Sequence, residues 1–133
     1  MVRLSKIIEG LEMVDDIVDC YYNQEKDEIF LSNIGEFEDL TEDEIDELFE
    51  KSIILPTQYE INEYKIIVDF INTIDNYEIK DKLHSLIQGK GAFRKFKDYC
   101  FEINIIQDWY KFKDEKYKEI AVNWCKKNGL EYM

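Results

Sequence analysis

The chain of 133 residues carries 30 acidic and 17 basic side chains, one His, three Cys and one Pro, which gives a net charge of −13. A hydrophobic fraction of 45% is too high for a disordered chain, and no apolar run approaches the roughly 20 residues of a membrane span. The charged start does not fit a signal peptide, and three scattered Cys fit free thiols in a reducing compartment. We therefore expect a soluble cytoplasmic protein with no membrane partner, and the oligomeric state stays open.

The charge is unevenly distributed along the chain. Residues 1–60 hold 18 acids and 4 bases, whereas residues 61–133 hold 12 acids and 13 bases. Within the second part, residues 80–127 hold 12 bases and 7 acids, a net charge of +5. This asymmetry predicts two electrostatically distinct faces or lobes.

The first elements are a helix and a hairpin. A helix is expected over residues 5–13, with Ser5 as its N-cap. Two β-favouring runs, Ile17–Tyr22 and Glu28–Ser32, flank a polar segment and predict a β-hairpin. An isolated hairpin is marginal in water, so a third strand is needed, and Ser52–Leu55 is the candidate.

The rest of the chain has helical periodicity. Thr41 and Thr57 are each followed three residues later by Glu, a pattern typical of a helix N-terminus. Thr41 predicts the start of a helix over 42–51, and Thr57 predicts the start of the strongest helix, over 58–75. Further helical segments are expected at 77–88, 92–101, 105–112 and 115–128.

Together these elements predict an α+β fold: an N-terminal helix and a small antiparallel β-hairpin or sheet, followed by a mostly helical C-terminal part. No repeat or linker interrupts the chain. We expect a single domain over 1–133, with an acidic α/β part at about 1–56 and a helical part at about 57–133.

The most distinctive stretch lies between residues 89 and 98. Two glycines next to a helix start can direct backbone N–H groups at an anion, and the helix dipole reinforces this effect. Bases recur at i, i+4 and i+7 on the helix that follows, which suits a phosphate-bearing ligand. The candidate anion site comprises Gly89, Lys90, Gly91, Arg94, Lys95 and Lys97.

The same stretch has a purely structural interpretation. The glycines can end one helix and admit the next, with Phe93 and Phe96 in the core. The bases can form a solvated face, and Arg94 can pair with Asp98 at i+4. The two interpretations differ in whether the cations are already paired.

A second candidate is the acidic block Glu36–Glu50, whose candidate interaction surface is Glu42, Asp43, Asp46, Glu47 and Glu50. It could bind a basic protein or mimic nucleic acid. It could also be an exposed amphipathic helix with acids at its N-terminus, or pack beside the basic stripe and partly neutralise it.

Catalytic chemistry has little support. His84 is the single imidazole, so a His-based metal site within one chain is excluded. A dyad of His84 with Cys20, Cys100 or Cys125 is a minor alternative, since Cys in apolar stripes behaves as a small hydrophobe. We expect no catalytic residue, no metal and no cofactor. Four aromatic residues could stack bases but fit a core better: Trp109, Tyr110, Phe112 and Trp124.

The block Gly89-x-Gly-Ala-Phe-Arg-x-Phe-Lys-Asp98 resembles the uncharacterised bacterial protein family number 0158. The early hairpin, Leu55-Pro56, Trp109-Tyr110-x-Phe112 and the ending Ala121-x-x-Trp124 agree with this resemblance. It implies a small cytoplasmic bacterial protein and brings no known activity, cofactor or catalytic residue.

These observations favour a non-enzymatic binding or regulatory module that contacts a phosphate-bearing partner, nucleic acid above all, through the basic helix face. The alternative is an acidic adaptor for a protein partner, or a nucleic-acid mimic. A Cys-dependent enzyme is the third and weakest hypothesis.

Overall fold

A computed structural model describes residues 1–32 and 39–133. The part of the acidic block at Glu36–Glu38 lies outside the described residues. The chain divides into two compact units: unit 1 comprises Met1–Ile61 and Tyr117–Met133, and unit 2 comprises Asn62–Lys116. The expectation of a single domain is not tested by this division and stays a prediction.

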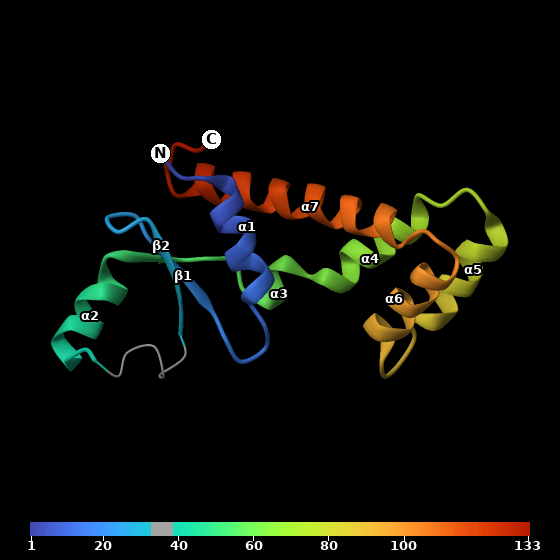
Figure 1. Ribbon diagram of the computed structural model, residues 1–133, viewed down its shortest axis with the longest axis horizontal. Coiled ribbons are helices and arrows are strands. Elements are labelled where there is room, and N and C mark those ends of the chain that lie inside the picture. Colours follow the sequence, from blue (N-terminus) through green and yellow to red (C-terminus); the bar gives the residue numbers. More distant parts are fainter. Residues whose placement is uncertain (33–38) are drawn as a thin grey trace. The chain divides into compact units, whose positions relative to one another are not determined.

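The elements follow the predicted order, with a helix first, a hairpin next and helices thereafter (Figure 1). They are α1 (Leu4–Met13), β1 (Cys20–Asn23), β2 (Glu28–Leu31), α2 (Glu42–Glu50), β3 (Ser52–Ile54), α3 (Gln58–Ile61), α4 (Glu63–Asn72), α5 (Tyr77–Leu86), α6 (Ala92–Glu102) and α7 (Ile106–Lys127). The α+β fold class is confirmed.

Unit 1 contains a three-stranded antiparallel sheet of order β2-β1-β3. In the register, Tyr22 of β1 stands between Ile29 of β2 and Ile53 of β3. The third strand that the isolated hairpin needed is therefore the segment that the sequence indicated.

The two faces of this sheet have different partners, because successive side chains of a strand point to opposite sides. On one face, Tyr22 meets Trp124 of α7 edge-on, at 6.1 Å between ring centroids. On the other face, Tyr21 and Phe30 contact Phe49 of α2, at 4.9 and 5.5 Å. Aromatic side chains thus fix both layers of unit 1 onto the sheet.

Gly10 lets α1 approach the sheet closely. A Cβ at this position would lie 2.6 Å from Leu55 Cδ1 and 3.3 Å from Ile29 Cγ2. Glycine in a helix costs about 1 kcal/mol relative to Ala, and here the close approach compensates for that cost. The chain ends are also joined in unit 1, since Val2 and Tyr132 form a parallel bridge.

Unit 2 consists of helices around an aromatic cluster. The Phe70 ring lies 6.0 Å from Phe96, 5.5 Å from Trp109 and 5.4 Å from Phe112, and Phe96 lies 5.0 Å from Trp109. Phe96 and Trp109 are fully buried. These residues come from α4, α6 and α7, so one cluster joins three of the helices of this unit.

Three expected details of the helices are wrong. The helix expected over 58–75 is divided into α3 and α4, because Asn62 adopts a left-handed conformation with φ of 51°. The separate segments expected at 105–112 and 115–128 are one helix, α7. The N-cap of α1 is Arg3, not Ser5.

Candidate functional site

The candidate anion site begins in the turn that leads into α6. Gly89 and Gly91 have φ of 79° and 73°, the left-handed region that favours glycine. Gly91 is the N-cap of α6, no side chain caps that end, and the first turn of α6 contains no acid. The first N–H groups of a helix have no acceptor within the helix, so this end is open to an anion.

The basic side chains of the site are exposed, or half-buried in the case of Lys97. Arg94 Nε lies 3.8 Å from Asp98 Oδ2, with the two side chains 89% and 74% exposed. An exposed pair of this length contributes little and is easily exchanged for another anion. In the described part of the chain, no carboxylate pairs with Lys90, Lys95 or Lys97.

Lys95 leans back toward the start of the helix. Its Cε lies 3.8 Å from the position that a Cβ on Gly91 would occupy. Helical side chains generally point toward the N-terminus, and this one does so. The aliphatic part of the Lys95 side chain therefore lies beside the glycine turn.

Phe93 differs from its expected role in the core. It is 41% exposed, whereas Phe96, one turn later, is fully buried. Phe93 instead lines a surface hollow of about 570 Å³ at the start of α6. The hollow is lined by Tyr64, Ile87, Gln88, Gly89, Gly91, Ala92, Phe93 and Arg94.

Tyr64 is one residue of this hollow that the candidate anion site did not include. It lies on α4, is 42% exposed, and its hydroxyl donates to the Ile87 carbonyl at 3.5 Å. No local signal could have placed it beside Phe93, which is 29 residues later in the chain.

The acidic interaction surface is placed on α2. Its five side chains, Glu42, Asp43, Asp46, Glu47 and Glu50, are all exposed. The Thr41 hydroxyl accepts from the Glu44 N–H at 3.2 Å, which confirms the predicted N-cap. Lys51 forms an ion pair with Glu47 at 2.8 Å and lowers the pKa of that carboxyl.

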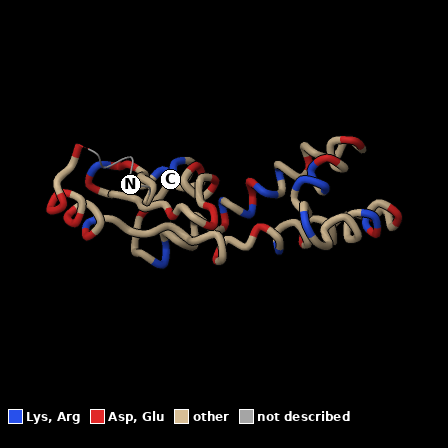
Figure 2. The backbone as a smooth tube through the Cα atoms, turned by 90° about the horizontal axis from the view of Figure 1, so that it is seen from below, with Lys and Arg blue, Asp and Glu red and all other residues tan. Residues whose placement is uncertain are grey.

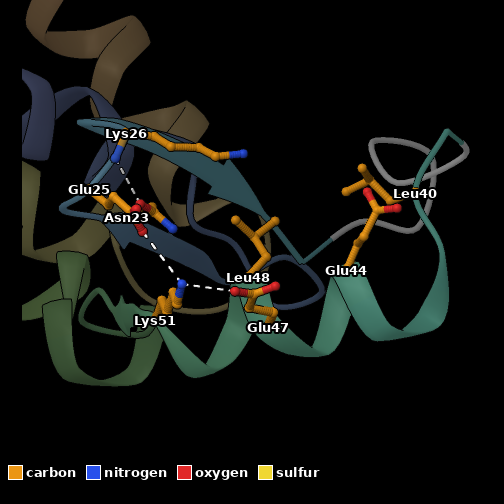
Figure 3. A pocket seen from close by; sticks show the side chains of 8 residues that line it. All are labelled: Asn23, Glu25, Lys26, Leu40, Glu44, Glu47, Leu48 and Lys51. Carbon is orange, nitrogen blue, oxygen red and sulfur yellow. Dashed lines mark hydrogen bonds and ion pairs between the residues drawn. The ribbon is translucent and has the colours of Figure 1, made fainter.

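A second hollow, of about 290 Å³, lies beside α2 (Figure 3). Lys51 stands between Glu47 and Glu25, 3.8 Å from the latter, so its charge is already shared by two carboxylates. Asn23, which is buried, accepts from the Lys26 N–H and donates to Ser52 Oγ. The other lining residues are Leu40, Glu44 and Leu48.

The three cysteines are buried thiols. Burial raises the pKa of Cys100 to about 12 and also raises the pKa of Cys125. Both are therefore protonated at neutral pH, whereas a nucleophilic cysteine needs its thiolate. The His84 ring contacts Asn72 Oδ1 at 3.2 Å.

Among the residues that the structure describes, no three His, Cys, Asp or Glu side chains gather as metal ligands would. Within the same residues, none of the helices combines the length and apolar character that crossing a membrane requires.

Comparison with known proteins defines the class to which the chain belongs. The model of the uncharacterised protein family UPF0158 matches residues 1–133, so the chain is a member of that family. The resemblance seen in the sequence is confirmed.

One relative is the UPF0158 protein PA5073 of Pseudomonas aeruginosa, which is 27% identical over 64 residues. The match covers 47% of this chain, and the chain spans about two-fifths (42%) of the length of that relative. No solved structure matches the chain.

Proposed function

We propose that this protein is a non-enzymatic binding module that contacts the phosphates of a nucleic acid through the start of α6. Lys90 lies in the turn before a helix end that no side chain caps, not on the helix as expected, and Arg94, Lys95 and Lys97 follow within the first two turns of α6. This run of cations supports the proposal most strongly. Arg94 can form two parallel hydrogen bonds with a phosphate, and the lysines add point charges.

The charge of unit 2 also supports the proposal. Residues 62–116 hold 10 basic and 10 acidic side chains, so this unit carries no net charge. The net charge of −13 belongs to unit 1, with 7 basic and 20 acidic side chains. Figure 2 shows basic and acidic positions interspersed along the backbone. A polyanion that approaches α6 thus meets a neutral unit with a local cationic surface.

Binding of short nucleic acids at low salt tests the proposal. Replacing a guanidinium with a carboxylate puts repulsion at the centre of the site, so Arg94→Glu should abolish binding. Lys82→Glu is the matched control, because it makes the same change of charge on α5, outside the candidate site. Equal binding by wild type and Arg94→Glu, or equal loss in both variants, would contradict the proposal.

The salt dependence gives a second measurement. If four cations each displace a counterion from a single strand, the logarithm of the association constant should fall with the logarithm of salt concentration with a slope of about −3. Lys97→Ala should reduce the slope by about 0.7. A slope near zero would mean that phosphate contacts do not drive the binding.

A second candidate function is an acidic adaptor that binds a basic protein through α2. Five exposed carboxylates on one short helix support it, with Lys51 as the described partner of Glu47. A basic protein should then co-purify in a nuclease-insensitive complex. Combined Glu42→Lys, Asp46→Lys and Glu50→Lys should release it while the circular dichroism spectrum stays unchanged. Retention by the triple variant would reject this function.

A further inference from the structure

The hollow at the start of α6 places two half-exposed aromatic rings beside the cations. Tyr64 and Phe93 both line it and are 42% and 41% exposed. Arg94 and the backbone of Gly89 and Gly91 line the same hollow. Two aromatic rings, a guanidinium group and the backbone of two glycines therefore line the same hollow.

This combination exceeds what phosphate binding requires. A site for phosphates alone needs cations and hydrogen-bond donors, and although a tyrosine hydroxyl can donate to a phosphate, the apolar ring of Phe93 contributes nothing to such contacts. Nucleobases, in contrast, stack on aromatic side chains regardless of their sequence, next to a positively charged groove that follows the backbone. A volume of about 570 Å³ is also within the range of small-molecule sites.

We infer that the site takes single-stranded nucleic acid, with an unpaired base entering the hollow against Phe93 and Tyr64. This inference rests on the proposed function and specifies its substrate class. The neighbouring phosphates contact Arg94, Lys90 and Lys95. A duplex presents phosphates at a higher density but keeps its bases stacked inside, so it cannot use the hollow.

Phe101 extends the same surface along α6. It is 73% exposed and lies one helical turn beyond Lys97, as Phe93 lies one turn before it. At 1.5 Å per residue, Phe93 and Phe101 are about 12 Å apart along the helix axis. Aromatic, basic and aromatic side chains thus follow each other along α6, as a single strand with exposed bases requires.

The test compares three fluorescent probes of equal length at low salt: an oligothymidylate, its abasic analogue and a duplex. We expect the oligothymidylate to bind wild type about tenfold more tightly than the abasic strand, because stacking is lost without the base. The duplex should bind more weakly than the oligothymidylate, although it carries more phosphates, because its paired bases cannot enter the hollow. Oligouridylate should also bind more tightly than the abasic strand, because uracil, which lacks only the methyl group of thymine, can stack on the same rings.

Substitutions of aromatic residues test whether the base binds in the hollow. Phe93→Ala should weaken oligothymidylate binding about tenfold and leave abasic binding unchanged, whereas Phe93→Trp should retain both. Tyr77→Ala is the matched control, since Tyr77 is a 79% exposed aromatic residue of α5 that does not line the hollow. Thermal unfolding of each variant verifies that it is folded.

The outcomes separate the inference from the proposed function. If all probes bind wild type equally and Arg94→Glu abolishes the binding of each probe, the proposed phosphate site is supported and the single-strand inference is wrong. If Phe93→Ala weakens the abasic strand as much as the oligothymidylate, base stacking is likewise rejected. If no probe binds wild type, both the function and the inference are overturned.

Discussion

The two units of this chain differ in the interactions that organise them and in their charge. Unit 1 is strongly acidic and is organised by a sheet, whereas unit 2 has no net charge and is organised by an aromatic cluster. The charge of the whole chain, −13, is therefore a poor guide to either surface. Because the interaction of exposed charges is screened beyond about 8 Å at physiological salt, the local charge balance around α6 matters more for an anion there than the charge of the whole chain.

The polar contacts of unit 1 centre on Asp27. Its carboxylate accepts from the Tyr22 hydroxyl at 2.7 Å and pairs with Lys6 at 3.5 Å and Arg3 at 3.6 Å. Lys6 also donates to the Asp27 carbonyl. A single residue of the hairpin loop thereby ties α1 to the sheet. In unit 2 the corresponding polar contact is a pair of residues, since Lys113 of α7 lies 3.6 Å from the Glu63 carboxylate of α4.

Removing the centre of the aromatic cluster should have the largest effect on stability. Phe70→Ala deletes a buried ring that contacts three others, and such truncations cost about 3–5 kcal/mol. Urea unfolding followed by circular dichroism measures the change. Phe70→Leu, which retains most of the volume, is the control and should lose much less. A loss below about 1 kcal/mol for Phe70→Ala would show that the cluster does not hold unit 2 together.

The two tryptophans sharpen the comparison between the units. In unit 1, Trp124 Nε1 donates to the Ile54 carbonyl at 2.8 Å, whereas in unit 2 the buried Trp109 Nε1 has no partner among the described residues. Trp124→Phe leaves that carbonyl without its donor, whereas Trp109→Phe removes an unsatisfied group. We expect Trp124→Phe to be the more destabilising by about 2 kcal/mol, measured by urea unfolding. The reverse order would mean that hydrogen bonding does not distinguish these two sites.

Gly10→Ala tests the close approach of α1 to the sheet. The added methyl meets Leu55 at 2.6 Å, and overpacking costs about 1–3 kcal/mol, whereas the gain in helix propensity is about 1 kcal/mol. We therefore expect a net loss of about 1 kcal/mol in chemical denaturation. Combining Gly10→Ala with Leu55→Val should recover part of this loss. A stabilised single variant would show that Leu55 moves aside freely.

Acid should weaken the contacts of Asp27. The hydrogen bond from Tyr22, with the charges of Lys6 and Arg3, lowers the pKa of Asp27 below its ordinary value of 3.8. A lowered pKa in the folded state means that the stabilisation is present above pH 3.8 and is lost as the pH falls through the folded pKa. Melting temperatures of wild type and Asp27→Asn should therefore differ at neutral pH and converge in acid. A difference that persists at low pH would contradict this role.

Local signals identified most of the fold. Thr41 and Thr57 begin helical segments as predicted, because each hydroxyl accepts from an N–H three residues later. The β-favouring runs gave the hairpin, and the need for a third strand pointed to Ser52–Leu55. Helix starts and strand-forming runs depend on residues that are close together in the chain, so they can be predicted without knowledge of tertiary contacts.

The break between α3 and α4 at Asn62 could not be predicted from the sequence. The apolar positions from Ile61 to Ile71 fit one continuous helix, but Ile61 belongs to unit 1 and Ile67 to unit 2. Asn adopts the left-handed conformation more readily than most residues, and its side chain also accepts from the Lys65 N–H as the N-cap of α4. Tertiary contacts determine which unit the residues on each side of Asn62 pack into.

The sequence by itself determined the α+β class, the starts of α2 and α3, the family and the stretch in which cations follow two glycines, since all of these are set by residue type and spacing. Only the tertiary structure decided that Phe93 is half-exposed while Phe96 is buried, and that Tyr64 lies at the same hollow as Arg94. The physical reason is that periodicity gives the face of a helix on which a residue lies, whereas exposure depends on which other helices cover that face.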